Sequence, residues 1–95
     1  AGMSPAECLL AVNAMLVRDR VSSMFATCFY AILDTRTGRL DYANAGHNPP
    51  YALRAAGGAV ERFPIGGGLP LGMFAKLKCA NASVALAPGD QVFLY

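Results

Sequence analysis

The 95-residue sequence has little charge. Charged residues make up 15% of it, against about 25% in an average soluble domain. The net charge is only +2, and the eight basic side chains are scattered along the chain, which argues against the clustered basic surface of a nucleic-acid-binding protein. No apolar run reaches the roughly 18 residues of a membrane span, and no signal peptide is visible. We therefore expect neither a nucleic-acid partner nor a membrane partner.

The sequence also lacks paired cysteines. Its three cysteines, Cys8, Cys28 and Cys79, are odd in number, lie far apart and form no Cys-x-x-Cys pair. This spacing argues against a zinc ribbon and against a disulfide framework. We expect reduced thiols in the core of a cytoplasmic protein.

Apolar residues, in contrast, are abundant, at 55% of the sequence. A chain of this length buries only about 60–65% of its unfolded surface, so a small charge-poor domain would leave much apolar surface exposed. The composition predicts that something outside the sequence covers this surface. We expect residues 1–95 to form one partial domain, covered by the rest of a larger domain or by a partner chain, and we expect the isolated chain to self-associate.

A helix is predicted from Pro5 to about Asp19. Ser4 can cap it, Pro5 suits the first helical position, and Glu7 completes a capping box. One apolar stripe is expected to be buried, comprising Cys8, Leu9, Val12, Met15 and Leu16.

The remainder reads as strands joined mainly by hairpins, which places the chain in the α+β class with mostly antiparallel sheets. The expected strands are Met24 to Asp34, Arg39 to Ala45, Tyr51 to Arg54, Ala59 to Phe63, Leu77 to Leu86 with Val84 and Leu86 pointing inward, and Gln91 to Tyr95. The first is almost continuously apolar, which predicts cover on both faces. Turns are expected at 34–38, at 55–58 and at Pro88-Gly89.

The segment Tyr42 to Pro50 carries the only histidine. Gly46 permits a positive φ, and the prolines after Asn48 stiffen the exit, so the chain should present a polar loop at the end of a strand. Asn44, His47 and Asn48 are the candidate site residues. The alternative is that they only hydrogen-bond the loop.

A second glycine-rich segment, Pro64 to Gly72, lacks the lysine and the glycine spacing of a phosphate-binding loop. We expect a bent loop packed on the sheet instead.

Three stretches resemble the SpoIIE-like branch of the metal-dependent PPM-type protein serine/threonine phosphatases. They are the strand from Met24 to Asp34, the loop from Tyr42 to Pro50, and the pair Gly68 to Gly72 with Leu86 to Asp90; the helix from Ser4 to Asp19 is also similar. The resemblance implies an αββα sandwich of two antiparallel sheets flanked by helices. It also implies hydrolysis of phosphoserine or phosphothreonine by metal-activated water, often on anti-sigma-factor antagonists of the STAS type. His47, Asn48 and Asn44 would then lie near the catalytic cleft.

The sequence departs from this family in its acidic residues. In the family, metal ligands come from a Gly-Asp segment upstream of the region that matches this chain and from an Asp-Gly segment directly after the strand that matches Leu94-Tyr95, and neither segment is among these 95 residues. The acids present are dispersed: Glu7, Asp19, Asp34, Asp41, Glu61 and Asp90. A two-metal site needs several carboxylates that converge on one point. We therefore expect no catalytic residue, no metal site and no cofactor site in this chain alone, and no hydrolysis by it. Manganese or magnesium is implied for the complete domain.

Asp34 and Asp90 are expected to be turn residues. One alternative to the phosphatase is a non-catalytic regulatory or scaffold domain of the same fold. An unrelated β-rich binding module is disfavoured by the order of the motifs.

Overall fold

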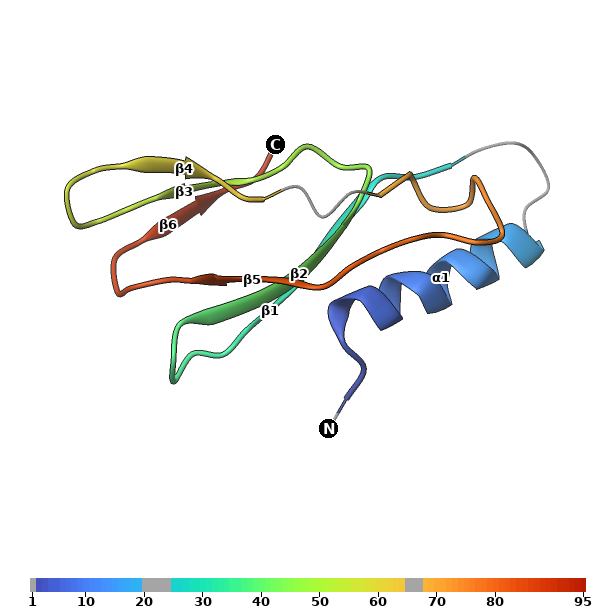
Figure 1. Ribbon diagram of the computed structural model, residues 1–95, viewed down its shortest axis with the longest axis horizontal. Helices are drawn as coiled ribbons and strands as arrows, with labels where there is room; N and C mark the ends of the chain where they lie inside the picture. The colour runs from blue at the N-terminus through green and yellow to red at the C-terminus, as the bar shows by residue number, and fades with distance from the viewer. Residues whose placement is uncertain (1, 20–24, 65–67) are drawn as a thin grey trace.

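The structure is a computed structural model that describes residues 2–19, 25–64 and 68–95. In these residues, one helix and six strands form three stacked layers (Figure 1). The elements are α1 (Pro5–Asp19), β1 (Cys28–Leu33), β2 (Arg39–Ala45), β3 (Tyr51–Leu53), β4 (Val60–Arg62), β5 (Ala82–Ala85) and β6 (Gln91–Phe93). No helix in these ranges is both long and apolar enough to span a membrane.

Each sheet has three antiparallel strands. The first has the order β1-β2-β5 and the second the order β4-β3-β6. In the first, Cys28 pairs with Ala45 and Leu33 with Leu40, so the hairpin closes over residues 34–38 as expected. Gly38 has a φ of 79° and lies against the Leu86 carbonyl, where a side chain would clash. The α+β class with mostly antiparallel sheets is thus confirmed.

An aromatic core lies between the two sheets. Tyr42 of β2 and Phe63, which follows β4, are almost fully buried, and their ring centroids are 5.2 Å apart. Phe29 of β1 stacks on Tyr42 at 5.3 Å. The buried hydroxyl of Tyr42 donates a hydrogen bond to the Pro64 carbonyl at 2.9 Å, so this polar group is satisfied within an apolar cluster. Val84 and Leu86 pack against this core, as predicted.

A second core lies between α1 and the first sheet. Its buried members are Ala6, Leu9, Ala43, Ala45, Leu71 and Leu77. The capping box is present, because Ser4 Oγ accepts a hydrogen bond from the Glu7 amide and Glu7 Oε1 accepts one from the Ser4 amide. These elements make three of the four layers of an αββα sandwich: one helix layer and two sheets.

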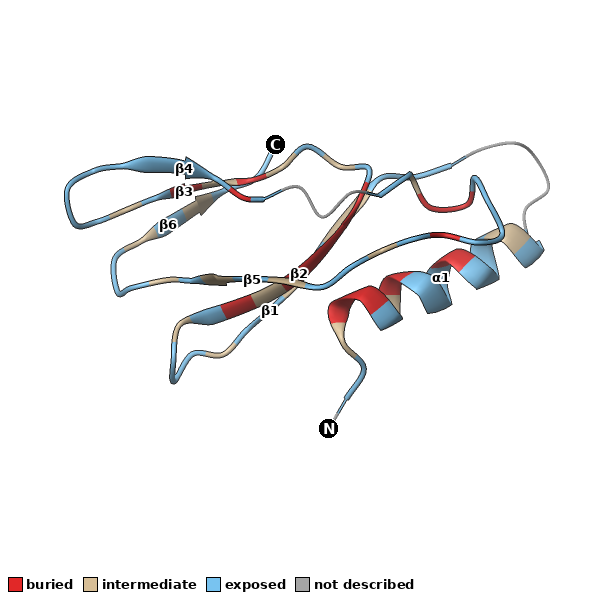
Figure 2. Ribbon diagram, in the orientation of Figure 1, coloured by how far each residue is buried: buried red, intermediate tan, exposed pale blue. Residues whose placement is uncertain are grey.

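The predicted apolar stripe of α1 is wrong in most of its members. Val12, Met15 and Leu16 are 40–54% exposed, whereas Asn13 is 1% exposed. Figure 2 shows buried and exposed stretches following one another along α1. The helix packs through the face that carries Ala6, Leu9 and Asn13, whose spacing of three and four residues puts them on one side. The larger apolar side chains lie on another flank of the helix, which the described residues leave open.

The first strand is shorter and less covered than predicted. It begins at Cys28, an isolated bridge joins Ala26 to Leu71, and Met24 lies outside the described residues. β1 is an edge strand, and its Tyr30, Ile32 and Leu33 are 38–48% exposed. The prediction that this strand is covered on both faces is therefore wrong for the described chain.

The predicted strand from Leu77 to Leu86 is also too long. Only Ala82–Ala85 pairs with β2. Upstream, the side-chain oxygen of Asn81 accepts a hydrogen bond from the Ala6 amide at 2.8 Å, and Leu77 is buried against α1. These contacts direct the segment toward the helix, so it does not follow the strand ladder. The strands β3, β4 and β6 are each one or two residues shorter than predicted.

Candidate functional site

The loop after β2 is shaped by Gly46. Its φ of 71° turns the chain at the end of the strand, and a side chain there would collide with the ring of Pro70. Glycine is therefore required both by the backbone conformation and by the neighbouring segment. The sequence prediction of a positive φ at Gly46 is confirmed.

Asn44 holds this loop closed from within the sheet. Its side-chain oxygen accepts a hydrogen bond from the His47 amide at 2.8 Å, and its side-chain nitrogen donates one to the His47 carbonyl at 3.0 Å. The residue is only 5% exposed. Both functional groups of this side chain are thus used by the backbone of the loop, which supports a positioning role for Asn44.

The ring of His47 is half-buried at the edge of the first sheet. Its Nδ1 lies 2.9 Å from the hydroxyl oxygen of Thr27. Nε2 forms no hydrogen bond within the described ranges, and no buried side-chain nitrogen or oxygen there is without a partner, so Nε2 reaches solvent. One edge of the imidazole is therefore oriented by Thr27, and the other edge is available to a ligand.

Asn48 is exposed and more loosely held than Asn44. Its side-chain nitrogen lies 3.5 Å from the Tyr95 carbonyl, at the long limit for a hydrogen bond. The structure thus brings His47 and Asn48 together on one loop and sets Asn44 beneath them as the buried support.

The glycine-rich segment packs on the sheet beside this loop. Gly68 approaches the Asn44 carbonyl so closely that a side chain could not fit, and Leu71 is buried in the core between α1 and β2. The expectation of a bent loop packed on the sheet is confirmed for residues 68–72; residues 65–67 lie outside the described part of the chain.

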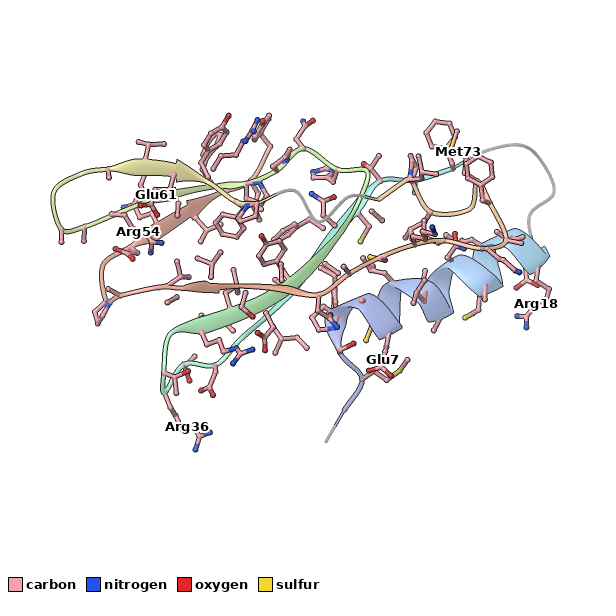
Figure 3. The ribbon with its side chains drawn as sticks, in the orientation of Figure 1. Glu7, Arg18, Arg36, Arg54, Glu61 and Met73 are labelled. Carbon is pink, nitrogen blue, oxygen red and sulfur yellow. The ribbon has the colours of Figure 1, made fainter. Side chains whose placement is uncertain are left out.

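The acidic side chains occupy separate places, as Glu7 and Glu61 illustrate in Figure 3. No group of three or more histidine, cysteine, aspartate or glutamate residues that could hold a metal ion occurs in the described ranges, which include all six acids. The donor set of these residues therefore does not fit the two-metal centre that the resemblance implies for the complete domain.

Each acid is engaged locally. Glu7 caps α1, and Asp19 and Asp41 pair with the neighbouring Arg18 and Arg39. Asp34 accepts a hydrogen bond from the Arg36 amide, which confirms it as a turn residue.

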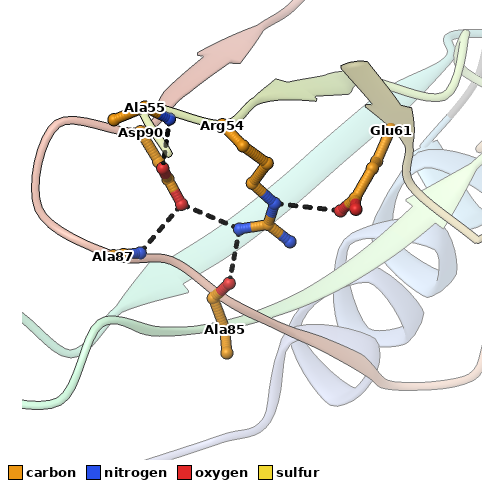
Figure 4. Close-up of polar contacts among 6 residues, drawn as sticks. All are labelled: Arg54, Ala55, Glu61, Ala85, Ala87 and Asp90. Carbon is orange, nitrogen blue, oxygen red and sulfur yellow. Dashed lines mark hydrogen bonds and ion pairs between the residues drawn. The ribbon is translucent and has the colours of Figure 1, made fainter. Parts of the chain in front are cut away.

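Asp90 does more than shape its turn. Arg54 donates to Asp90 at 2.8 Å, to the Ala85 carbonyl at 2.7 Å and to Glu61 at 2.9 Å (Figure 4). Amide hydrogen bonds from Ala55 and Ala87, together with Arg54, lower the pKa of Asp90 to about 2. This network ties the β3–β4 hairpin to the turn before β6. The sequence did not predict this network, because Arg54 and Asp90 are 36 positions apart and no local pattern links them.

A second missed residue is Asn13. It donates to the Phe74 carbonyl at 2.9 Å and accepts from the Gly72 amide at 2.7 Å. The spacing could have predicted this role, because Asn13 is four positions after Leu9 and therefore lies on the same face of the helix.

The three cysteines are free thiols, half-buried rather than fully buried. Burial raises the pKa of Cys28 and of Cys79, which keeps both thiols protonated at neutral pH. Among the residues that the structure describes, none around these thiols marks them as nucleophiles.

The chain is similar to known bacterial proteins. Protein IcfG of Synechocystis sp. is 32% identical over 73 residues, which cover 77% of this chain and 11% of that protein. Phosphoserine phosphatase RsbP of Bacillus subtilis is 26% identical over 98 residues, covering 99% of this chain and 24% of the relative. The chain thus spans less than a quarter of the length of either relative.

A solved structure has the same fold. The crystal structure of the RsbU and RsbW domains of Rv1364c from Mycobacterium tuberculosis matches with a TM-score of 0.76 and 28% identity, over 96% of this chain and 25% of that one. The profile of the SpoIIE family, described as stage II sporulation protein E, matches residues 1–95. Because this match spans the whole chain, the chain belongs to the SpoIIE family.

Proposed function

We propose that these 95 residues are part of a protein phosphatase domain that removes phosphate from phosphoserine or phosphothreonine. The observation that carries this proposal is the family match over residues 1–95, together with a relative named phosphoserine phosphatase that aligns with 99% of the chain. The structural match to a protein with an RsbU domain supports the same reading. The proposed substrate is a phosphorylated STAS-type regulatory protein in the cytoplasm, of the anti-sigma-factor antagonist kind.

This chain's part in that reaction is to build and hold the loop from Asn44 to Asn48. Asn44 fixes the backbone of the loop, Thr27 orients the His47 ring, and Nε2 of His47 with the Asn48 amide is left for substrate phosphate or bound water. The resemblance to the PPM-type phosphatases implies that the complete domain depends on metal ions. The carboxylates of the described residues, however, do not fit a pair of metal ions. We therefore assign no metal-dependent step to a residue of this chain, and the manganese or magnesium ligands of the complete domain would come from other residues.

The test uses the full-length protein that contains this sequence. Phosphate release from a serine-phosphorylated STAS protein of the same organism is measured with manganese and with magnesium, and unphosphorylated STAS protein gives the background. We expect metal-dependent release that falls in His47→Ala and is unchanged in Arg36→Ala, because Arg36 lies on an exposed hairpin away from the loop. Folded full-length protein without any release from phosphorylated substrate would refute the proposal and favour a non-catalytic regulatory domain of the same fold.

A further inference from the structure

A pocket lies along the segment that follows the glycine-rich stretch, outside the loop of the proposed function. Its volume is about 640 Å³, within the range of about 300–1,000 Å³ typical of ligand pockets. The lining residues are Gly68, Leu69, Phe74, Ala75, Lys76 and Lys78. We call this feature the Lys76–Lys78 pocket.

The pocket presents apolar surface to solvent. Leu69 is 51% exposed and Phe74 is 50% exposed, although both are large apolar side chains. Apolar side chains that gather around a cavity are typical of sites that receive an apolar anchor from a ligand.

Two lysines give the same pocket a positive charge. Lys76 and Lys78 are exposed on either side of the buried Leu77, and both line the pocket. All six acidic side chains of the sequence are described, and each is bound locally elsewhere: to Ser4, Arg18, Arg36, Arg39 or Arg54. No carboxylate side chain of this chain therefore neutralises the two lysines.

The segment that lines the pocket is attached to α1 and to the segment before β1 by hydrogen bonds. Asn13 of α1 binds the Gly72 amide and the Phe74 carbonyl, and Leu71 exchanges two backbone hydrogen bonds with Ala26 at 2.6 and 3.0 Å. Leu77 anchors the segment between the lysines in the core against α1. A preformed wall lowers the ordering cost of binding, so this segment is suited to recognition.

We propose that the Lys76–Lys78 pocket docks an acidic segment of a protein partner. An apolar side chain of the partner contacts Leu69 and Phe74, and carboxylates beside it pair with Lys76 and Lys78. Two cations beside exposed apolar side chains fit a protein segment better than nucleic acid, because nucleic acid binding relies on many phosphate contacts and the chain carries a net charge of only +2. The pocket adjoins the His47 loop through Gly68, which lies against Asn44, but the docking does not depend on catalysis.

The test is fluorescence anisotropy on the full-length protein. The probe is a fluorescein-labelled peptide, Gly-Glu-Glu-Leu-Phe-Glu-Glu-Gly, and the matched probe carries glutamine in place of every glutamate. We expect the acidic peptide to bind more tightly than the glutamine peptide, and to bind more weakly when salt is raised from 50 to 500 mM. The double variant Lys76→Gln with Lys78→Gln should weaken binding about two- to thirtyfold, the range for two exposed ion pairs.

The control variant is Arg62→Gln, which removes another exposed cation that has no carboxylate partner in the described chain, on the other sheet. It should bind the peptide as the unmodified protein does. Phe74→Ser should weaken binding to a similar extent at both salt concentrations, and circular dichroism of each variant checks the fold.

Three results would overturn the proposal: equal binding of the two peptides, equal loss in Arg62→Gln, or unchanged binding in the folded double variant. The double variant could instead lose binding to anionic phospholipid vesicles while its affinity for the acidic peptide stays unchanged. That result would also overturn the proposal and would indicate that the pocket binds a membrane surface.

Discussion

Replacing Asn44 by alanine should destabilise the protein by a predictable amount. The change removes two hydrogen bonds, of 2.8 and 3.0 Å, from a side chain that is 5% exposed. At about 1 kcal/mol for each bond, the free energy of unfolding should fall by about 2 kcal/mol. If the unit that unfolds has 150–250 residues, this corresponds to a midpoint lower by about 4–8 °C.

The assay is thermal unfolding of the full-length protein followed by circular dichroism. Asn44→Asp keeps an acceptor for the His47 amide but sets a carboxylate oxygen against the His47 carbonyl in a buried site, so its loss should be at least as large as that of Asn44→Ala. Asn48→Ala is the matched control, because the same atoms are removed from an exposed residue of the same loop with one long contact. It should change the free energy of unfolding by less than about 0.5 kcal/mol.

An Asn44→Ala protein that melts within 1 °C of the unmodified one would refute the view that Asn44 holds the loop closed. A loss in Asn48→Ala as large as that in Asn44→Ala would do the same, because both changes would then act only through general effects on the loop.

Four further predictions follow from the structure. His47→Ala should lower phosphatase turnover of the full-length protein with little change in melting temperature, and Thr27→Val, which removes the group beside Nδ1, should lower turnover less; equal losses of turnover and stability would favour a structural role for His47. The pKa of Asp90 is lowered from 3.8 to about 2, so its stabilising contribution is complete above about pH 4 and is lost as the pH falls toward 2. The difference in unfolding free energy between the unmodified protein and Asp90→Asn should therefore shrink over that interval in urea titrations, and a constant difference would contradict the assignment. The isolated 95-residue chain should associate with itself, since Val60, Phe93, Leu94 and Tyr95 are 51–63% exposed, and a monomer at high micromolar concentration by size exclusion with light scattering would disprove this. The same isolated chain should neither hydrolyse p-nitrophenyl phosphate with millimolar manganese nor give a heat of manganese binding in calorimetry; manganese-dependent hydrolysis lost in His47→Ala would show that the chain builds a catalytic site.

Local chemistry was sufficient to predict which secondary elements and turns occur and in what order, but not where the strands end. Ser4 and Glu7 fixed the start of α1, and Gly38, Gly46 and Gly89 marked positions whose φ values are 79°, 71° and 87°. Such features depend on residues within a few positions of one another, so they can be read from the chain alone.

The candidate loop was also recognisable, because a glycine, two asparagines, a histidine and two prolines follow a strand within a few residues. The sequence did not predict which of the two asparagines supports the loop and which one is exposed. Asn44 is buried because β2 is covered on both faces from Tyr42 to Ala45, whereas Asn48 lies beyond the end of the strand and is exposed.

What tertiary structure alone decided is which apolar face is buried and which distant polar groups meet. Helical periodicity placed Val12, Met15 and Leu16 in the core stripe together with Leu9, yet the position of α1 against β2 buries only Leu9 of these four, with Ala6 and Asn13 beside it. Arg54 and Asp90 meet because β3 pairs with both β4 and β6, and the Lys76–Lys78 pocket exists because Leu77 is anchored against α1. The sequence by itself determined the elements, the hairpins and the polar loop, since those follow from local backbone preferences. The buried face and the long-range contacts depend on how the layers stack. Whether a side chain is buried then depends on which residues of the other layers pack against it.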